Sequence, residues 1–559
     1  MSPRHRDLLL VVLAAAALYL PGLGRHDLWN PDEARYAQVA REMRQGSGLL
    51  VPHLNGEVYA QKPPLLFWSI AAASAPWGRV TETAARLPSA LAGIAAVALT
   101  FLIARRFFGR RAAWLAAATF ATCFKTVWQA RFGQIDMLLA ALVAAAVWCW
   151  VRGHTEDRPN LYPLFFLFTG LATLAKGPVG LLPPLLAVTA YHALGREWGA
   201  LRRLRVGWGL LLWAAVVALW LVPAGIAGGA DYFETLVLRQ NVTRFAEPWH
   251  HQQPWYYYLT VLPGDFFPWS LLLPAAAVAG WRSLRRRGVG AGVEGGPEAE
   301  LAGRGFRFAL CWVIVTLVFF SLSPGKRTVY VFTMYPGMAL LVGAGLDRLA
   351  AAWGGAGARP AGGSGPSRAW LLAPLVLLAL GCATALAAVA TVGMDRPEVA
   401  LLGTRVPIAV MAVVTGLLAA SLVGLATVSR WQVVPGAAAL AAAMALLPGV
   451  AAFVVLPAFD VFKSARPLAR ELVSRTPPGT PFGIVPHLDN TFVFYTGRRA
   501  VPLGSQEEVR AYLARPGRAW VLAESDDLAR LALAELPLVE VAADPSGDEH
   551  AYVLLAEEE

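Results

Sequence analysis

Long apolar runs follow one another along most of this 559-residue chain, and they leave few folds open to it. A helix needs about 20 largely apolar residues to cross the hydrocarbon core of a bilayer. Hydrophobic residues make up 57% of the chain and charged residues only 15%, against about 25% charge in soluble proteins. The sequence therefore predicts an α-helical polytopic membrane protein. It excludes a soluble globular protein, and we expect neither disorder nor a nucleic-acid partner.

The apolar pattern predicts 13 membrane spans. They are residues 7–24, 86–104, 112–130, 136–151, 161–175, 178–194, 207–228, 258–280, 307–323, 329–350, 370–392, 405–428 and 433–456. Residues 63–76 are also apolar, but this stretch is short and bounded by Pro63 and Pro76, which favours an interfacial or re-entrant helix. The first run follows Arg4 and Arg6 and has no small-x-small cleavage site, so we expect an uncleaved anchor.

Basic residues fall at alternate connections between these spans, and in membrane proteins such residues collect on the cytoplasmic side. The clusters are Arg105 and Arg106 with Arg110 and Arg111; Arg152 with Arg158; Arg196 with Arg202, Arg203 and Arg205; Arg282 with Arg285, Arg286 and Arg287; Arg359 with Arg368; and Arg430. All of these clusters lie on the cytoplasmic side only if residues 63–76 do not cross the membrane. The pattern predicts a cytoplasmic N-terminus and an outer C-terminus, and it explains the net charge of +11 without an anionic partner.

Composition divides the chain into two predicted domains. Residues 1–456 form the membrane domain, with a first outer loop at residues 25–63. Residues 457–559 mix short β-type runs with helical stretches, which indicates a small extracytoplasmic α/β domain. The connections at 288–303 and 354–367 are rich in Gly, Ala and Pro and are predicted to be flexible loops. The four cysteines lie inside apolar runs without the spacing of a disulfide framework or a zinc site.

The remaining ionisable residues gather at the outer ends of the predicted spans, where charge is costly and usually functional. In the first outer loop, Asp32 is either part of a helix N-terminus or a carboxylate that acts as a general base. Lys62, which follows Tyr59, Ala60 and Gln61 and precedes two prolines, is either a snorkelling cation or a phosphate-binding charge. Asp136 could cap its helix, and Lys176 could belong to a simple turn.

A large outer loop between the seventh and eighth spans contains Arg239, Arg244, His250 and His251. The two arginines could contact a phosphate, and the aromatic residues around them suit an interfacial belt. Adjacent histidines cannot easily point at one site, so a metal centre made of these two alone is not expected.

Several short motifs, taken in order, resemble those of a known enzyme group. They are Asp32-Glu33-Ala34-Arg35-Tyr36, Lys62-Pro63-Pro64-Leu65, Asp136-Met137-Leu138, Ala175-Lys176-Gly177-Pro178, Gln252-Gln253-Pro254-Trp255-Tyr256, and Ser323-Pro324-Gly325-Lys326-Arg327 followed by Tyr330. The set resembles the bacterial ArnT-like branch of the GT-C glycosyltransferases, in the family 39/83 group. The resemblance runs through about residues 20 to 350.

The resemblance implies an inner-membrane enzyme that moves a sugar from a polyprenyl-phosphate donor, such as an undecaprenyl-phosphate sugar, to an acceptor on the periplasmic face, in the best-known branch lipid A. It implies catalytic roles for Asp32 and Asp136, and donor or phosphate binding by Arg35, Tyr36, Tyr59, Lys62, Lys176, Arg244, Lys326 and Tyr330. It also implies a divalent cation (Zn, Mg or Mn) held by His250 or His251. Without a GxGxxG or P-loop pattern, we expect no nucleotide cofactor.

Two departures from the family pattern bear on the acceptor and the site. Gln61 replaces the acidic residue that often precedes the Lys-Pro-Pro motif, and Arg35 stands where protein O-mannosyltransferases have a histidine. The second departure favours a lipid acceptor over a protein acceptor. A protein O-mannosyltransferase-like enzyme stays an alternative. A transporter or flippase is a further alternative, although transporter sites tend to lie at the membrane midplane.

Overall fold

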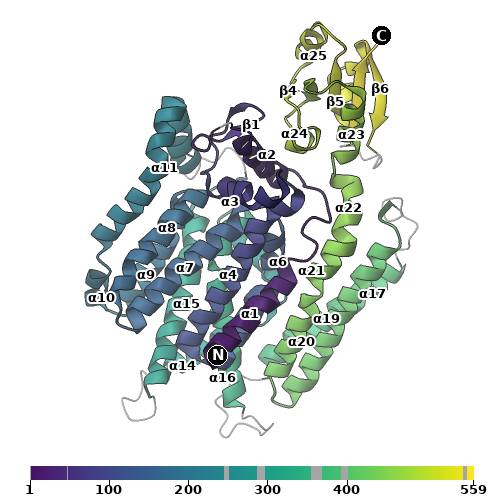
Figure 1. Cartoon of the computed structure of the whole chain (residues 1–559). Helices are drawn as coiled ribbons and strands as arrows, with labels where there is room; N and C mark the ends of the chain where they lie inside the picture. The colour runs from purple at the N-terminus through teal and green to yellow at the C-terminus, as the bar shows by residue number, and fades with distance from the viewer. Residues whose placement is uncertain are drawn as a thin grey trace.

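Long helices run side by side through most of the molecule, and a small α/β unit lies beyond one end of them (Figure 1). The computed structural model describes residues 2–46, 48–243, 251–285, 296–353, 368–391, 401–544 and 551–558. Within these residues, eight helical stretches are long and apolar enough to cross a membrane. The polytopic helical fold predicted from the sequence is confirmed. The count of 13 crossings and their orientation stay predictions.

Each predicted span corresponds to one or more helices. The helices of the bundle are α1 (Pro3–Tyr19), α4 (Glu82–Phe108), α5 (Arg110–Thr122), α6 (Phe124–Arg131), α7 (Ile135–Thr155), α8 (Tyr162–Lys176), α9 (Leu182–Leu194), α10 (Trp198–Arg203), α11 (Val206–Glu234), α13 (Tyr257–Asp265), α14 (Leu273–Arg285), α15 (Pro297–Leu322), α16 (Tyr335–Ala352), α17 (Ala369–Thr391), α19 (Arg405–Ser429), α20 (Val434–Ala445), α21 (Leu447–Val450) and α22 (Leu456–Lys463).

Small residues allow these helices to approach closely. A Cβ added to Gly343 of α16 would lie 2.7 Å from the backbone nitrogen of Ala116 in α5, so only glycine fits this crossing. Within lipid, helices gain little from the hydrophobic effect and associate through such close packing. The Ala-rich and Gly-rich composition of the spans therefore serves the packing of the bundle.

One loop prediction is wrong and another is not tested. Helix α15 begins at Pro297, so the last part of the predicted flexible connection at 288–303 is helical. Proline at the first helical position and two acids, Glu298 and Glu300, in the first turn are favourable at a helix N-terminus. The second connection, residues 354–367, lies outside the described residues.

The first outer loop folds over one end of the bundle. It contains α2 (Asp32–Arg44) and the hairpin of β1 (His53–Leu54) and β2 (Glu57–Val58), and α3 (Leu65–Ala73) follows it directly. Helix α3 has nine residues, which at 1.5 Å per residue is far too short to cross a bilayer. The apolar stretch between Pro63 and Pro76 is therefore a short helix at the end of the bundle, as predicted.

The C-terminal α/β unit is a five-stranded sheet with helices packed on it. Its strands, in the order β4-β3-β5-β7-β6, are β3 (Phe482–Val485), β4 (Ala500–Pro502), β5 (Trp520–Glu524), β6 (Leu538–Ala543) and β7 (Tyr552–Glu557). Strand β3 pairs in parallel with β4 and β5, and β7 pairs antiparallel with β5 and β6. The helices are α23 (Arg466–Arg475), α24 (Asn490–Thr496), α25 (Gln506–Leu513) and α26 (Ser525–Arg530).

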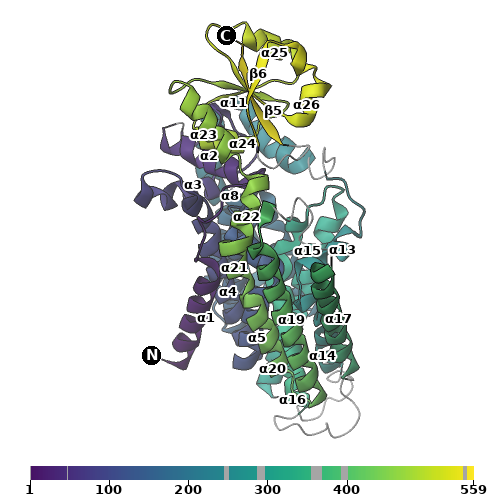
Figure 2. The same ribbon diagram turned by 90° about the vertical axis from the view of Figure 1, so that its right-hand side faces the viewer.

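This unit lies against the first outer loop, with α24 beside α2 (Figure 2). The side chain of Asn55 exchanges two hydrogen bonds with the backbone of Ala500 in β4, at 2.8 and 2.9 Å. Arg41 of α2 donates to the carbonyl of Phe494 at 2.5 Å and lies over its ring. The apolar helix before the unit continues to Lys463, past the domain boundary expected at residue 456.

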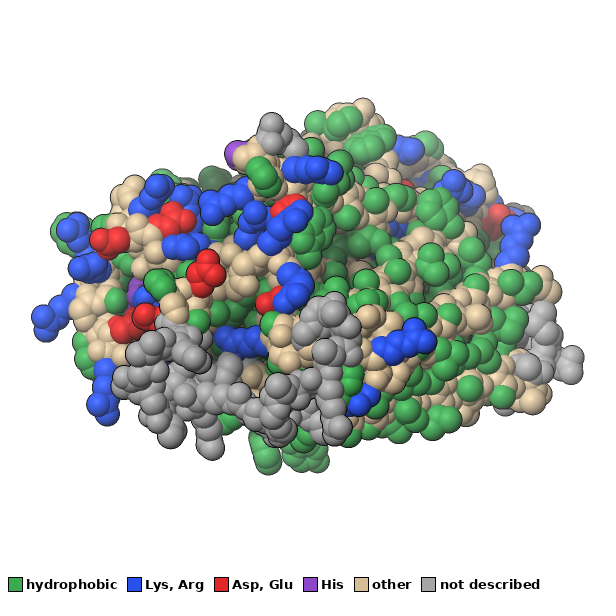
Figure 3. Space-filling view, turned by 90° about the horizontal axis from the view of Figure 1, so that it is seen from below, with side chains coloured by type: hydrophobic (Ala, Val, Ile, Leu, Met, Phe, Trp, Pro, Cys, Tyr) green, Lys and Arg blue, Asp and Glu red, His purple; other side chains and the backbone are tan. Residues whose placement is uncertain are grey.

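Basic side chains gather over the end of the bundle opposite to the α/β unit (Figure 3). Arg110, Arg158 and Arg203 there have side chains 58% to 68% exposed. This distribution supports a cytoplasmic location for that end.

We expect a thiol-labelling experiment to report this orientation. In a variant whose four native cysteines are replaced by alanine, Glu507→Cys in α25 should react with a membrane-impermeant maleimide in intact spheroplasts. Arg158→Cys should react only after the membrane is permeabilised. Labelling of Arg158→Cys in intact spheroplasts would show that the orientation in the membrane is the reverse of the predicted one.

Candidate active site

Asp32 forms the first part of the site, at the start of α2. Its Oδ2 lies 3.2 Å from Nη2 of Arg327, and the hydroxyl of Tyr36, one turn further along α2, donates to Oδ1 at 3.4 Å. The side chain of Asp32 is 12% exposed and that of Arg327 is 34% exposed. An acid at a helix N-terminus is stabilised by the helix dipole. The carboxylate of Asp32 is therefore half-buried. Two contacts fix its orientation, and part of it stays accessible to solvent.

Asp136 and Lys176 form the second part. Asp136 lies in the first turn of α7 and Lys176 is the last residue of α8, so each charge suits the dipole of its own helix end. The Lys176 ammonium donates to Oδ1 of Asp136 and lies 4.7 Å from the centre of the Tyr330 ring. Both side chains of the pair are only 10% to 13% exposed.

Electrostatic coupling joins the two pairs into one cluster. Burial lowers the pKa of Arg327, but the charges of Asp32 and Asp136 outweigh it and raise that pKa. Burial raises the pKa of Tyr36 well above its usual value, and the charge of Asp32 adds to this. We call Asp32, Tyr36, Asp136, Lys176, Arg327 and Tyr330 the Asp32 cluster. It presents two carboxylates and two cations at one end of the bundle.

Of the other residues predicted in the first outer loop, Tyr59 and Arg35 lie beside Tyr36 of this cluster. Tyr59 is buried and packs edge-on against Phe67, 5.9 Å between ring centres, and Tyr36 contacts the same ring at 5.6 Å. Arg35 and Lys62 are half-buried. Tyr59 and Tyr36 thus pack against the same ring, that of Phe67.

Lys326 serves a different purpose from the one predicted, because its ammonium faces backbone carbonyls. The residue is 3% exposed and donates to the carbonyls of Ser323 and Gln253 at 2.6 and 3.0 Å. Burial lowers its pKa. It is Arg327, a residue of the same motif to which the resemblance assigned no role, that contacts Asp32. Two neighbours in a non-helical loop point in different directions, and the sequence does not show which one faces the site.

Of Arg244, His250 and His251, the structure describes only His251. Arg244 and His250 lie outside the described residues. His251 is exposed, and its carbonyl accepts a hydrogen bond from the backbone nitrogen of Lys326 at 2.9 Å. A cation at His250 or His251 stays a prediction of the resemblance.

A buried ion pair behind Asp32 fixes the start of α2. Arg86 of α4 is fully buried and makes two 2.8 Å hydrogen bonds to Glu33. Glu33 also accepts from the backbone nitrogen of Gly133, just before α7, at 2.7 Å. Burial alone would raise the pKa of Glu33, but Arg86 lowers it below its ordinary value. An arginine at the start of an apolar run is the signal for such a pair, since a charge buried there requires a partner.

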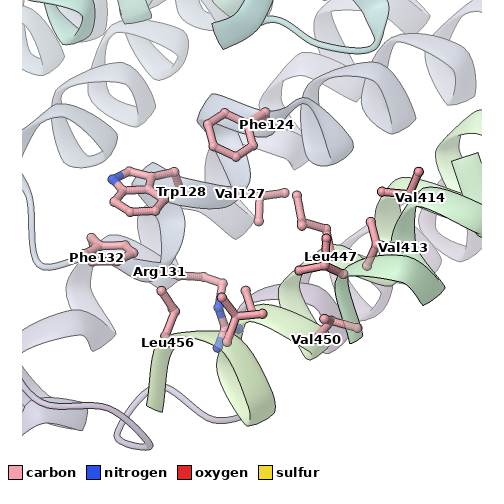
Figure 4. A pocket seen from close by; sticks show the side chains of 13 residues that line it. Phe124, Val127, Trp128, Arg131, Phe132, Val413, Val414, Leu447, Val450 and Leu456 are labelled. Atoms are coloured by element: carbon pink, nitrogen blue, oxygen red, sulfur yellow. The ribbon is translucent and has the colours of Figure 1, made fainter. Parts of the chain in front are cut away.

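A separate apolar cavity of about 260 Å³ lies between α6 and the helices α19, α21 and α22 (Figure 4). Its lining includes Trp128, Phe132, Val413 and Leu447, with Arg131 at its edge. The Arg131 guanidinium donates to backbone carbonyls at the end of α1 and just beyond it. The residues that line this cavity include no Asp, Glu or His, so it offers no general acid or base.

The chain is similar to known proteins in sequence and in fold. The family described as dolichyl-phosphate-mannose-protein mannosyltransferase matches residues 61–224. The whole chain superposes on apo ArnT from Cupriavidus metallidurans with a TM-score of 0.79 and 23% identity, covering 99% of this chain and 98% of that one. The chain therefore has the ArnT fold. The crystal structure of the same ArnT bound to undecaprenyl phosphate gives a TM-score of 0.76, 22% identity and the same coverage.

A curated relative supports the ArnT-like assignment in sequence. The undecaprenyl phosphate-alpha-4-amino-4-deoxy-L-arabinose arabinosyl transferase 1 of Pseudomonas fluorescens (strain Pf0-1) is 31% identical over 340 residues, which are 60% of this chain and 56% of that protein. The match thus spans less than two thirds of that relative's length. The resemblance to ArnT-like GT-C proteins that the motifs predicted is confirmed.

We expect Arg327 and Lys326 to fail in different ways when each is changed to glutamine. Arg327→Gln should lower kcat/KM of a reaction that uses Asp32 about 100-fold, because a cation beside Asp32 is lost, and should leave the melting temperature in detergent unchanged. Lys326→Gln should lower the melting temperature, because two buried carbonyls lose their donor. Equal loss of stability in both variants would contradict the separation of their roles.

We also expect Arg86→Leu to destabilise the fold by about 3–5 kcal/mol, because it leaves Glu33 buried without its partner. Arg203→Leu is the control. Its ion pair with Asp157 joins side chains that are 66% and 82% exposed, so it should cost no more than about 1 kcal/mol. Thermal unfolding followed by circular dichroism measures both, and similar melting temperatures would show that the buried pair is not an anchor.

Proposed function

We propose that this chain is a glycosyltransferase that moves a sugar from a polyprenyl-phosphate donor to a phosphate-bearing lipid acceptor. The observation that carries the proposal is the Asp32 cluster, in which Asp32 and Asp136 lie beside Arg327 and Lys176 at one end of the bundle. The curated relative named above acts, by its name, on an undecaprenyl-phosphate sugar. The ArnT neighbour has been crystallised with undecaprenyl phosphate.

The proposed reaction makes one bond and breaks one. An acceptor oxygen bonds to the anomeric carbon of the sugar, and the bond from that carbon to the donor phosphate oxygen breaks. The polyprenyl phosphate leaves with the electron pair of that bond. Lys62, Lys176 and Arg327 stabilise the negative charge that develops on it.

Asp32 acts on the acceptor side of this reaction. Its carboxylate orients the attacking oxygen, and it takes the proton when the acceptor is a hydroxyl or a protonated phosphate. In the structure Arg327 and Tyr36 each contact one of its two oxygens. A bound donor phosphate competes for Arg327 and so frees Asp32 to face the acceptor.

The acceptor distinguishes two forms of the proposal. Arg35 in place of the histidine of protein O-mannosyltransferases favours a lipid, with lipid A as the first candidate. The match of residues 61–224 to a family described as a protein mannosyltransferase favours a protein acceptor as the second candidate. In either form, we place the site and the α/β unit on the periplasmic side of a bacterial inner membrane, in agreement with the basic opposite end.

The test is transfer of radiolabelled sugar by the purified protein in liposomes. The donor is undecaprenyl-phosphate 4-amino-4-deoxy-L-arabinose, and the acceptors are lipid A and an extract of envelope protein. We expect label in lipid A, with kcat lowered by at least about 100-fold in Asp32→Asn, because general-base catalysis contributes about that much or more.

The matched control is Asp347→Asn. Asp347 pairs with Arg111 at the opposite end of the bundle, so its loss should leave transfer unchanged. Label in protein would move the assignment to a protein glycosyltransferase. Transfer that survives in Asp32→Asn would remove Asp32 from the chemistry.

A further inference from the structure

Three side chains that are able to bind a metal meet at the end of the bundle opposite to Asp32. His154 lies in the last turn of α7, His192 near the end of α9, and Glu197 just before α10. Their ligand atoms all lie within 4.8 Å of one another, and in the described part of the chain this is the one such group of three. None of the three takes part in the function proposed above.

The spacing of these atoms is close to that of a tetrahedral zinc site. Oε2 of Glu197 lies 3.4 Å from Nε2 of His154 and 3.2 Å from Nδ1 of His192. Tetrahedral ligands with bonds of 2.0–2.1 Å to zinc lie about 3.3–3.4 Å apart. Two histidines and a glutamate are a known zinc donor set that leaves a fourth position for water. Two of the three separations therefore need almost no adjustment.

Packing holds the two imidazoles in place. Trp150 stacks on the His154 ring, with 5.4 Å between centres, and meets the His192 ring edge-on at 5.6 Å. The histidine side chains are 6% and 1% exposed, whereas Glu197 is 27% exposed. The rings are thus oriented in advance, and the carboxylate lies on the side from which an ion enters.

Two arginines of α15 contact the donor atoms of this group. Nη2 of Arg304 lies 2.6 Å from Nε2 of His154. A guanidinium has only donors, so this nitrogen of His154 must present its lone pair, the one that a metal would use. Nη2 of Arg307 donates to Oε1 of Glu197 at 2.8 Å and leaves Oε2 facing the histidines.

We propose that His154, His192 and Glu197 bind a zinc ion, which takes the place of the Arg304 guanidinium at His154. Nitrogen and carboxylate donors in this number suit zinc. The ion cross-links α7, α9 and the turn before α10, far from the Asp32 cluster. This site does not depend on the proposed sugar transfer.

The test is zinc binding by the purified full-length protein in detergent, after treatment with a chelator. ZnCl₂ is titrated in competition with a chromophoric chelator, and bound metal is counted by mass spectrometry. We expect one equivalent of zinc in the wild type and none at this site in His192→Ala or Glu197→Gln. Arg304→Gln should bind zinc roughly tenfold more tightly, because a competing cation is removed and partners of a metal ligand change affinity by about that factor.

A control separates this site from any cation at the outer face. His251→Ala should bind the same equivalent as the wild type. Cobalt(II) in place of zinc should give the visible absorption of a tetrahedral complex in the wild type and not in Glu197→Gln, which reports on the site itself in folded protein. Zinc binding that is unchanged in His192→Ala and Glu197→Gln, or absent from both the wild type and Arg304→Gln, would overturn the proposal.

Discussion

The buried pair of Glu33 and Arg86 is the interaction on which the candidate active site depends. A charge at this depth is tolerated only with a partner and with its donors used. Besides Glu33, Arg86 donates to the carbonyls of Leu23, His26 and Asp27 at 2.7 to 2.9 Å. The guanidinium of Arg86 thus binds the segment between α1 and α2 at three carbonyls and fixes it against α4. Asp32 is the residue next to this anchor, and its position beside Arg327 follows from it.

The parts of the site that the sequence predicts well are those that lie at helix ends. Asp32, Asp136 and Lys176 were expected on one side because the apolar spans alternate in direction, and the structure brings them into one cluster. The alternation of spans fixes which end of a helix faces which side, without any knowledge of packing. For the same reason the helical ranges themselves were largely predictable from the apolar pattern.

Other features depend on side-chain direction or on distant contacts, which the pattern does not contain. Lys326 and Arg327 are adjacent in a loop, and only the fold shows that the first supports backbone and the second meets Asp32. His154 and Glu197 lie near basic connections that the sequence explained by topology alone, so their meeting with His192 was not foreseen. The contact of Asn55 with Ala500 joins residues 445 positions apart, and no local signal marks it.

Residues of α22 and of the α/β unit hold the first outer loop in place, and this affects the order in which the molecule is assembled. Asp460 of α22 accepts hydrogen bonds from the backbone nitrogen of Asp27 at 3.1 Å and from the indole of Trp29 at 2.8 Å, and Tyr495 receives one from the backbone of Leu28. These partners are separated by more than 430 residues. Synthesis proceeds from the N-terminus, so the loop that carries Asp32 leaves the ribosome long before the groups that hold it. The nascent chain therefore carries an unfinished site until Asp460 and Tyr495 have been made.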